Sequence, residues 1–96
     1  MNNDYIPNNV PNLDCLDSSE LMAFYGEAHL HNRVKARELF ASRPKGYCRV
    51  TKDLGHYAAN LATAQRCRLS GDINTAQVYE TICDRIYSEL PTYAQW

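Results

Sequence analysis

A chain of 96 residues has the length of one small domain, and its 45% hydrophobic and 22% charged residues are typical of a folded globular protein, not of a disordered chain, a collagen-like repeat or a coiled-coil rod. No apolar run approaches the ~20 residues needed to span a bilayer, and the first residues lack a signal-peptide pattern, so no membrane partner is expected. The net charge of −1 is unevenly spread, because residues 1–32 carry five acids and no Lys or Arg, whereas residues 33–68 carry nine bases and two acids.

Residues 1–16 are predicted to form an extended N-terminal arm, and residues 17–96 a single helical domain. Five Asn and two Pro residues in the arm favour turns and extended backbone over helix. Apolar residues punctuate the arm, and such residues order an arm by packing on their own domain or on a neighbour. The candidate oligomer contacts are Tyr5, Ile6, Val10 and Leu13.

The first helix is predicted over residues 18–42. Asp17 and the two serines after it are N-cap candidates, and Glu20 adds an acid to the first turn. The apolar pattern weakens across His29–Arg33, where the helix could bend or break. No proline interrupts it before Pro44, so one continuous helix is preferred.

Two further helices are predicted over residues 51–69, with Thr51 as N-cap, and over residues 73–90. Gly71 in the turn between them suits the left-handed conformation that ends many helices. The short turn makes an antiparallel hairpin, on which the first helix packs. The prediction is therefore an all-α, three-helix up-down fold, with Ile82 and Ile86 in its core.

The stretch from Tyr57 to Pro91 resembles a tetratricopeptide-type hairpin. The resemblance rests on a short set of positions: Gly71-Asp72 at the turn, then Ala76, Tyr79-Glu80 and Pro91. Thr63-Ala64 stands where that family has a Leu-Gly pair, Pro91 falls several residues late, and no second copy occurs at a 34-residue period. The resemblance implies a protein-binding role, but it covers only about a third of the chain.

The four cysteines form no C-x-x-C pair, so neither a zinc knuckle nor a thioredoxin-like motif is present. In a hairpin that turns near residue 71, Cys67 and Cys83 lie about 10 Å apart along the helices, because each residue rises ~1.5 Å. A disulfide needs Cα atoms within ~7 Å. We therefore expect free thiols, which fit a cytoplasmic location.

Metal binding and catalysis have weak signals. Glu27/His31 and Asp53/His56 each place a carboxylate and an imidazole on one side of a helix, and such pairs can build a metal site in a helical bundle. Surface ion pairs and helix capping explain them equally well, so no metal ligand is assigned. Neither a G-x-S-x-G motif nor a Gly-rich phosphate loop is present. We expect no enzyme activity, assign no catalytic residue and predict no cofactor.

Residues 33–52 concentrate bases around one aromatic residue. Bases hold phosphates and aromatic rings stack on nucleobases, although bases also complement acids and helix dipoles within a fold. The candidate anion or nucleic-acid contacts are Arg33, Lys35, Arg37, Arg43, Lys45, Tyr47, Arg49 and Lys52.

These patterns favour a small non-enzymatic association module or accessory subunit that forms a homo-oligomer, most simply a dimer, or binds another protein. Three helices with a long first member leave an apolar strip uncovered, and a second copy would cover it. A nucleic-acid-binding accessory protein that uses the basic segment is the alternative, and a metal-binding helical bundle is the third hypothesis.

Overall fold

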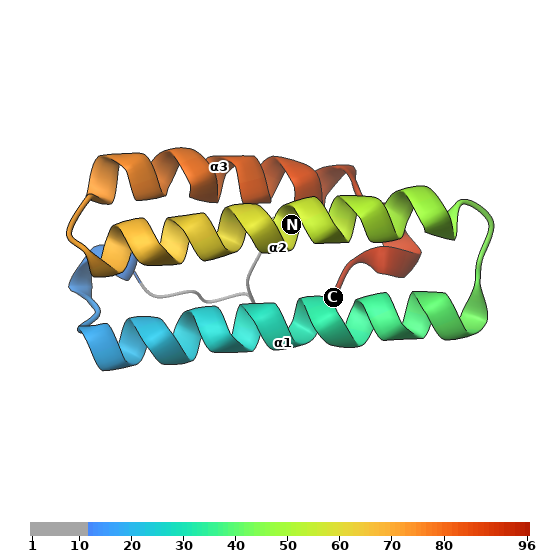
Figure 1. Ribbon diagram of the computed structural model, residues 1–96, viewed down its shortest axis with the longest axis horizontal. Helices are drawn as coiled ribbons and strands as arrows, with labels where there is room; N and C mark the ends of the chain where they lie inside the picture. Colours follow the sequence, from blue (N-terminus) through green and yellow to red (C-terminus); the bar gives the residue numbers. More distant parts are fainter. Residues whose placement is uncertain (1–11) are drawn as a thin grey trace.

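The computed structural model describes residues 12–96, which form three α-helices in an up-down arrangement (Figure 1). This part of the chain contains no strand, so the predicted all-α fold is confirmed. In chain order the elements are the 3-10 helix η1 (Leu13–Cys15), α1 (Ser18–Ser42), α2 (Tyr47–Leu69), α3 (Ile73–Glu89) and the 3-10 helix η2 (Thr92–Ala94).

Local sequence explains where α1 and α3 begin. The Asp17 carboxylate accepts the Glu20 N–H at 2.8 Å and the Glu20 carboxylate accepts the Asp17 N–H at 3.0 Å, which is a capping box. Asp72 caps α3 by accepting the Thr75 N–H at 3.3 Å. Gly71 has φ +90°, the left-handed conformation predicted for the turn.

α1 runs through His29–Arg33 without a break, as predicted. The apolar pattern weakens there because Asn32 occupies a core-facing position and is only 4% exposed. Its Nδ2 donates a hydrogen bond of 3.0 Å to the Leu54 carbonyl oxygen in α2. A buried polar side chain requires such a partner, and here the bond ties α1 to α2 instead of ending α1.

α2 begins at Tyr47, four residues before the predicted start at Thr51. Residues 47–49, which belong to the basic segment 33–52, therefore form the first turn of α2. Gly46 precedes the helix at φ +83°, a conformation open to glycine, so the chain reverses in few residues. The Thr51 hydroxyl donates to the Cys48 carbonyl at 3.0 Å inside the helix and caps nothing.

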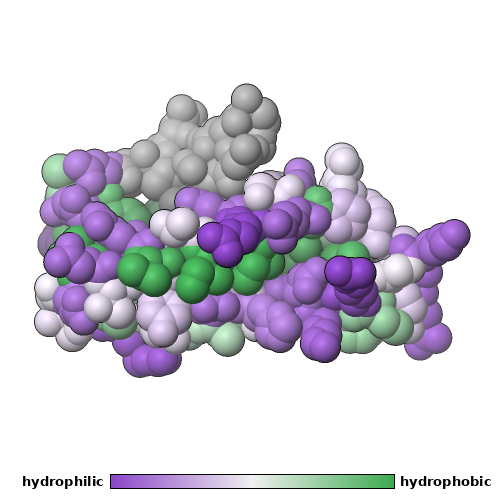
Figure 2. Space-filling view, turned by 90° about the horizontal axis from the view of Figure 1, so that it is seen from above, coloured by the Kyte–Doolittle hydropathy of each residue, from purple (hydrophilic) through white to green (hydrophobic). Residues whose placement is uncertain are grey.

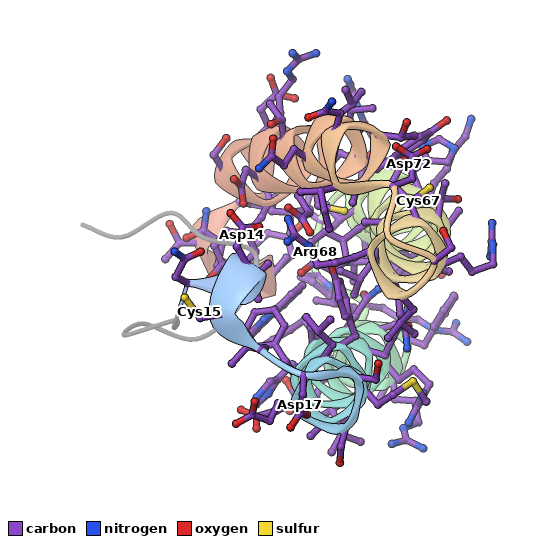
Figure 3. The ribbon with its side chains drawn as sticks, turned by 90° about the vertical axis from the view of Figure 1, so that its left-hand side faces the viewer. Asp14, Cys15, Asp17, Cys67, Arg68 and Asp72 are labelled. Carbon is purple, nitrogen blue, oxygen red and sulfur yellow. The ribbon has the colours of Figure 1, made fainter. Side chains whose placement is uncertain are left out.

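α2 is the central helix, because it packs on both α1 and α3 whereas those two helices barely contact each other. Between α1 and α3, the remaining side of the bundle is occupied by η1 and the C-terminal tail (Figures 1 and 3). The largest fully buried side chains come from all three helices: Tyr25, Leu54, Tyr57, Leu61 and Cys83.

The C-terminal tail docks on this core through its aromatic residues. The Trp96 ring packs edge-on against Tyr57 and Tyr87, with ring centroids 5.2 and 4.9 Å apart. The Tyr93 hydroxyl donates to the Lys45 carbonyl oxygen at 3.0 Å. The tail therefore joins the end of α3 to the connection between α1 and α2.

The predicted register of α3 needs one correction. α3 buries four residues at spacings of 4, 3 and 4: Ala76, Glu80, Cys83 and Tyr87. Ile86 is half-buried and packs on the core, but Ile82 is not among the residues that do, so its assignment to the core is wrong. The fully buried face of α3 includes Glu80 and does not include Ile82.

The end of the predicted arm is not extended. Leu13–Cys15 form η1, and the Asn12 side chain caps it by accepting the Asp14 N–H at 3.0 Å. Leu13 is half-buried against the core of its own chain. The other three predicted oligomer contacts, Tyr5, Ile6 and Val10, lie outside the described residues.

All four cysteines lie within residues 12–96 and are free thiols, so Cys67 and Cys83 form no disulfide, as expected. Cys83 is fully buried, and its Sγ lies 3.7 Å from the Tyr57 carbonyl oxygen, to which it donates. Burial raises the pKa of the Cys83 thiol to about 12.

Removing a core side chain of α2 tests this packing. Leu61 is fully buried, so Leu61→Ala is expected to lower the free energy of unfolding by about 2–5 kcal/mol through lost burial and a residual cavity. Val78 on α3 is 57% exposed, and Val78→Ala should change it by less than about 0.5 kcal/mol. Urea titration measures both values, and equal losses would contradict the described core.

Candidate functional site

A buried cluster of polar side chains lies at the end of the bundle where α2 meets α3. Arg68, in the last turn of α2, has a side chain only 3% exposed. Its Nε and Nη2 donate to the two carboxylate oxygens of Glu80 in α3, at 2.8 and 2.9 Å. This bidentate contact fixes both the distance between the guanidinium and the carboxylate and their relative orientation.

Two further groups complete the cluster. The Tyr25 hydroxyl in α1 donates to Glu80 Oε2 at 2.5 Å, and Arg68 Nη1 donates to Asp14 Oδ1 in η1 at 2.7 Å. Figure 3 shows Arg68 between the helices and Asp14 on η1 beside it. Each of the three α-helices and η1 thus contributes one side chain to the cluster.

The sequence brings these groups together by ordinary helical spacing. Arg68 follows Leu54 and Leu61 at intervals of seven residues, so it continues the buried face of α2. Glu80 lies between Ala76 and Cys83 on the buried face of α3. The cluster is therefore part of the core, with polar groups at positions that would otherwise be apolar.

The electrostatics favour a structural role for the cluster. The hydrogen bonds that Arg68 donates to the Glu80 carboxylate raise the pKa of Arg68, so the guanidinium stays charged. Burial, and then the nearby Glu80 carboxylate, raise the pKa of the Tyr25 hydroxyl, so it stays a neutral donor. The Asp14 carboxylate keeps 54% of its side chain exposed, which lowers the desolvation cost of the second negative charge.

The predicted basic site is only partly available to an anion. Lys35 pairs with Glu38, with Nζ and Oε1 3.0 Å apart. Arg43 ends α1 at φ +48° and its Nε donates to the Phe40 carbonyl at 3.4 Å. Tyr47 is half-buried and packs edge-on against the Phe40 ring, with centroids 6.1 Å apart, so it holds the connection onto α1.

The remaining predicted cations make no ion pair with any described residue: Arg33, Arg37, Lys45, Arg49 and Lys52. They come from α1, α2 and the connection between them, and Arg33 and Lys35 diverge because they are two residues apart on one helix. One central base, Arg68, pairs with an acid of the first 32 residues, Asp14. Among the bases of residues 33–68, some therefore form ion pairs with described residues and others do not.

The histidine pairs stay separate. His31 Nε2 and Glu27 Oε1 are 3.6 Å apart on α1, whereas Asp53 and His56 form no ion pair. Within residues 12–96, no three His, Cys, Asp or Glu side chains are placed to hold a metal ion. The helices of this region also lack the combined length and apolar character that crossing a bilayer requires.

A cavity of about 190 Å³ lies between α1 and α2, with Asn32, Arg33, Thr51 and Gly55 among its lining residues. The Leu54 carbonyl oxygen can only accept a hydrogen bond. The Asn32 side-chain amide is therefore oriented with its nitrogen toward Leu54 and its oxygen pointing away from Leu54. Asn32 Oδ1 is buried and has no hydrogen-bond partner among the described residues. The wall of the cavity is otherwise mostly small or apolar.

Sequence reasoning missed both buried polar features. Arg68 belongs by charge to the central bases, although its spacing from Leu54 and Leu61 places it on a buried face. Asn32 lies four residues after Ala28 and seven before Leu39, which is also a core-facing spacing. The signal in the sequence was a polar residue at a spacing of four or seven from apolar residues of a buried helix face.

Comparisons of this chain with protein-family models, with curated proteins and with solved structures find no match. Function must therefore be inferred from the geometry of the chain itself.

Breaking the buried pair is expected to be more costly than removing it. Arg68→Met leaves the Glu80 carboxylate buried without its cation, and should lower the free energy of unfolding by about 3–5 kcal/mol. The double variant Arg68→Met/Glu80→Leu removes both buried charges and should be more stable than Arg68→Met. Urea unfolding compares them with Arg66→Met, an exposed control on the same turn, and a double variant less stable than the single would refute this account.

His29 should make stability depend on pH. Burial, reinforced by the Arg33 charge, lowers the pKa of the half-buried His29 below its ordinary value, so folding favours its neutral form. The contribution of neutral His29 to the free energy of unfolding is fully present above the ordinary pKa of ~6.5. It is lost as the pH falls through the lowered pKa of the folded state.

The variant His29→Gln should therefore lose less unfolding free energy than the natural chain when the pH falls from 7 to 5. His56→Gln changes an exposed imidazole and serves as the control. Urea titrations at each pH measure the difference, and an unchanged pH dependence in His29→Gln would show that another group is responsible.

Proposed function

We propose that this chain is a small helical association module whose partner is another protein chain, in the first instance a second copy of itself. The observation that carries the proposal is the side of α1 that faces away from α2. Leu30 and Val34 are 46% and 37% exposed there, one helical turn apart. Each lies two residues after a buried position, Ala28 or Asn32, and so on the opposite side of the helix.

α1 therefore carries apolar side chains on two sides. Near its ends, Met22 and Phe40 are also 53% and 57% exposed, but both contact α2: Met22 Sδ accepts from Gln65 Nε2 at 3.5 Å, and the Phe40 ring packs on Tyr47. Contiguous exposed apolar groups on a small protein are typical of interaction sites, and a helix that is apolar on several sides is usually covered on several sides. Among the described elements, α2 makes the most extensive contact with α1.

Gly26 supports the same interpretation. It lies one turn before Leu30 in the interior of α1, where glycine costs about 1 kcal/mol relative to alanine. A Cβ added at this position would meet no atom of residues 12–96 within 4 Å, so the packing of these residues does not require a glycine. Close approach of another backbone is what a glycine on a helix surface allows.

The outer side of α3 is a weaker candidate for the same role. Figure 2 shows a hydrophobic band on the face of the molecule on which α3 lies, and Val78 on α3 is 57% exposed. Val78 is the one large apolar side chain exposed on α3, whereas the side of α1 that faces away from α2 has two, Leu30 and Val34. Val78 therefore provides a matched control for the α1 side.

Association should depend on Leu30 and persist in salt, because apolar burial is not screened. We expect sedimentation equilibrium to show a dimer at 0.1 M and at 1 M NaCl, and Leu30→Asp to shift it to monomer while circular dichroism stays unchanged. Val78→Asp should leave the dimer intact. A natural chain that stays monomeric at high protein concentration would refute the proposal.

Nucleic-acid binding is a second candidate, supported by the five cations of residues 33–52 that lack ion pairs among the described residues. Binding to phosphates would weaken steeply with salt. Fluorescence anisotropy with labelled single-stranded and duplex DNA and RNA tests it. Salt-sensitive binding that is lost when Arg43, Lys45 and Arg49 are replaced by Gln would establish this function in place of self-association.

A further inference from the structure

The outward side of α1 carries six exposed residues at spacings of 4, 3, 4, 3 and 4: Ala23, Glu27, Leu30, Val34, Arg37 and Ala41. We call this set the outer α1 face. Alternating steps of three and four residues keep side chains on one side of a helix, and they are the spacing by which paired helices pack. The intrachain contacts of α1 use the opposite side.

The order of residue types on the outer α1 face is symmetric about position 32. Positions 23 and 41 are both alanine, positions 30 and 34 are both aliphatic, and positions 27 and 37 carry opposite charges. A two-fold axis at the level of residue 32 brings position 30 of one antiparallel helix opposite position 34 of the other, because the two numbers in each pair add to 64.

We propose that two copies of this chain pair through their outer α1 faces, antiparallel, with the two-fold axis at the level of residue 32; this inference rests on the self-association proposed above. Leu30 then packs against the partner's Val34 at the centre. Glu27 meets the partner's Arg37 on each side, and Ala23 meets the partner's Ala41 at each end. The alanines and Gly26 let the helices approach closely.

The charges on α1 agree with this register. Arg37 makes no ion pair with any described residue, so its guanidinium is available to a partner. Glu27 Oε1 lies 3.6 Å from His31 Nε2 and forms no ion pair with any Lys or Arg among the described residues. In the proposed register Glu27 and Arg37 on the outer α1 face each lie opposite a residue of opposite charge. A parallel pair in register would instead oppose like charges.

The expected affinity is modest. The outer α1 face spans 18 residue steps, or about 27 Å of helix, which is at the low end of the interfaces that hold stable dimers. The dimer should therefore dissociate in the micromolar range, where sedimentation measures it directly.

Charge reversal tests the register. Glu27→Arg alone places a second guanidinium opposite the partner's Arg37 twice per dimer, and Arg37→Glu alone opposes two glutamates twice, so each variant should dimerise about tenfold more weakly than the natural chain. An equimolar mixture of the two variants should form a heterodimer in which no like charges face each other, because one interface pair joins two introduced charges and the other joins two natural ones. Its affinity should be close to that of the natural chain. Lys52→Glu, an exposed charge reversal on α2, should dimerise normally.

Sedimentation at 0.1 M NaCl measures these affinities, and the outcomes separate the two proposals. Full recovery in the mixture supports the antiparallel register, as does only partial recovery when either variant is mixed with Lys52→Glu, because that heterodimer keeps one like-charge pair. A natural dimer that Leu30→Asp dissociates, with no recovery in the mixture, would overturn the register while self-association through α1 stands. A natural chain that is monomeric throughout would overturn both.

Discussion

The buried ion pair between Arg68 and Glu80 is the contact on which the arrangement of the helices depends. It sets the register of α2 against α3, and the Tyr25 hydroxyl extends it to α1. This link is important because α1 and α3 hardly touch each other directly. In an apolar core of the same size, one helix could shift slightly along another. A guanidinium in bidentate contact with a carboxylate does not allow such a shift, because the shift would leave buried charges unpaired.

Asn32 has the same effect between α1 and α2. Its hydrogen bond to the Leu54 carbonyl fixes how far α1 can slide along α2, much as a buried asparagine fixes the register of a coiled coil. α1 thus holds its position through two specific polar contacts, one from Tyr25 and one from Asn32. The apolar contacts of α1 supply burial, and the polar ones select a single alignment.

The fold could be predicted from sequence because its signals are local. The cap at Asp17, the turn at Gly71 and the 3–4 spacing of apolar residues identify three helices and their order. The start of α2 could not be placed, since Gly46 allows a reversal so tight that no separate cap is needed. The register of α3 was also missed, because apolar periodicity alone counts Ile82 as core and Glu80 as surface.

The buried cluster is harder to predict for a physical reason. A charged residue is compatible with a core position only if its partner arrives from another element, and that partner is visible only after the helices are assembled. Asp14, Tyr25, Arg68 and Glu80 are distant in the sequence and come from four elements. In the basic segment, Tyr47 and Lys35 find partners nearby on the chain, and the anion contacts expected there stay a prediction.

Because the cysteines differ in burial, the rates at which their thiols react report on unfolding of the chain. Cys15 and Cys48 are exposed, so a maleimide or disulfide reagent reaches them in the native state. Cys83 is completely enclosed between α2 and α3, and its thiolate is suppressed at neutral pH, so it reacts only from conformations in which those helices have separated. The slowest labelling phase of the natural sequence thus reports how often the hairpin opens, with no engineered probe.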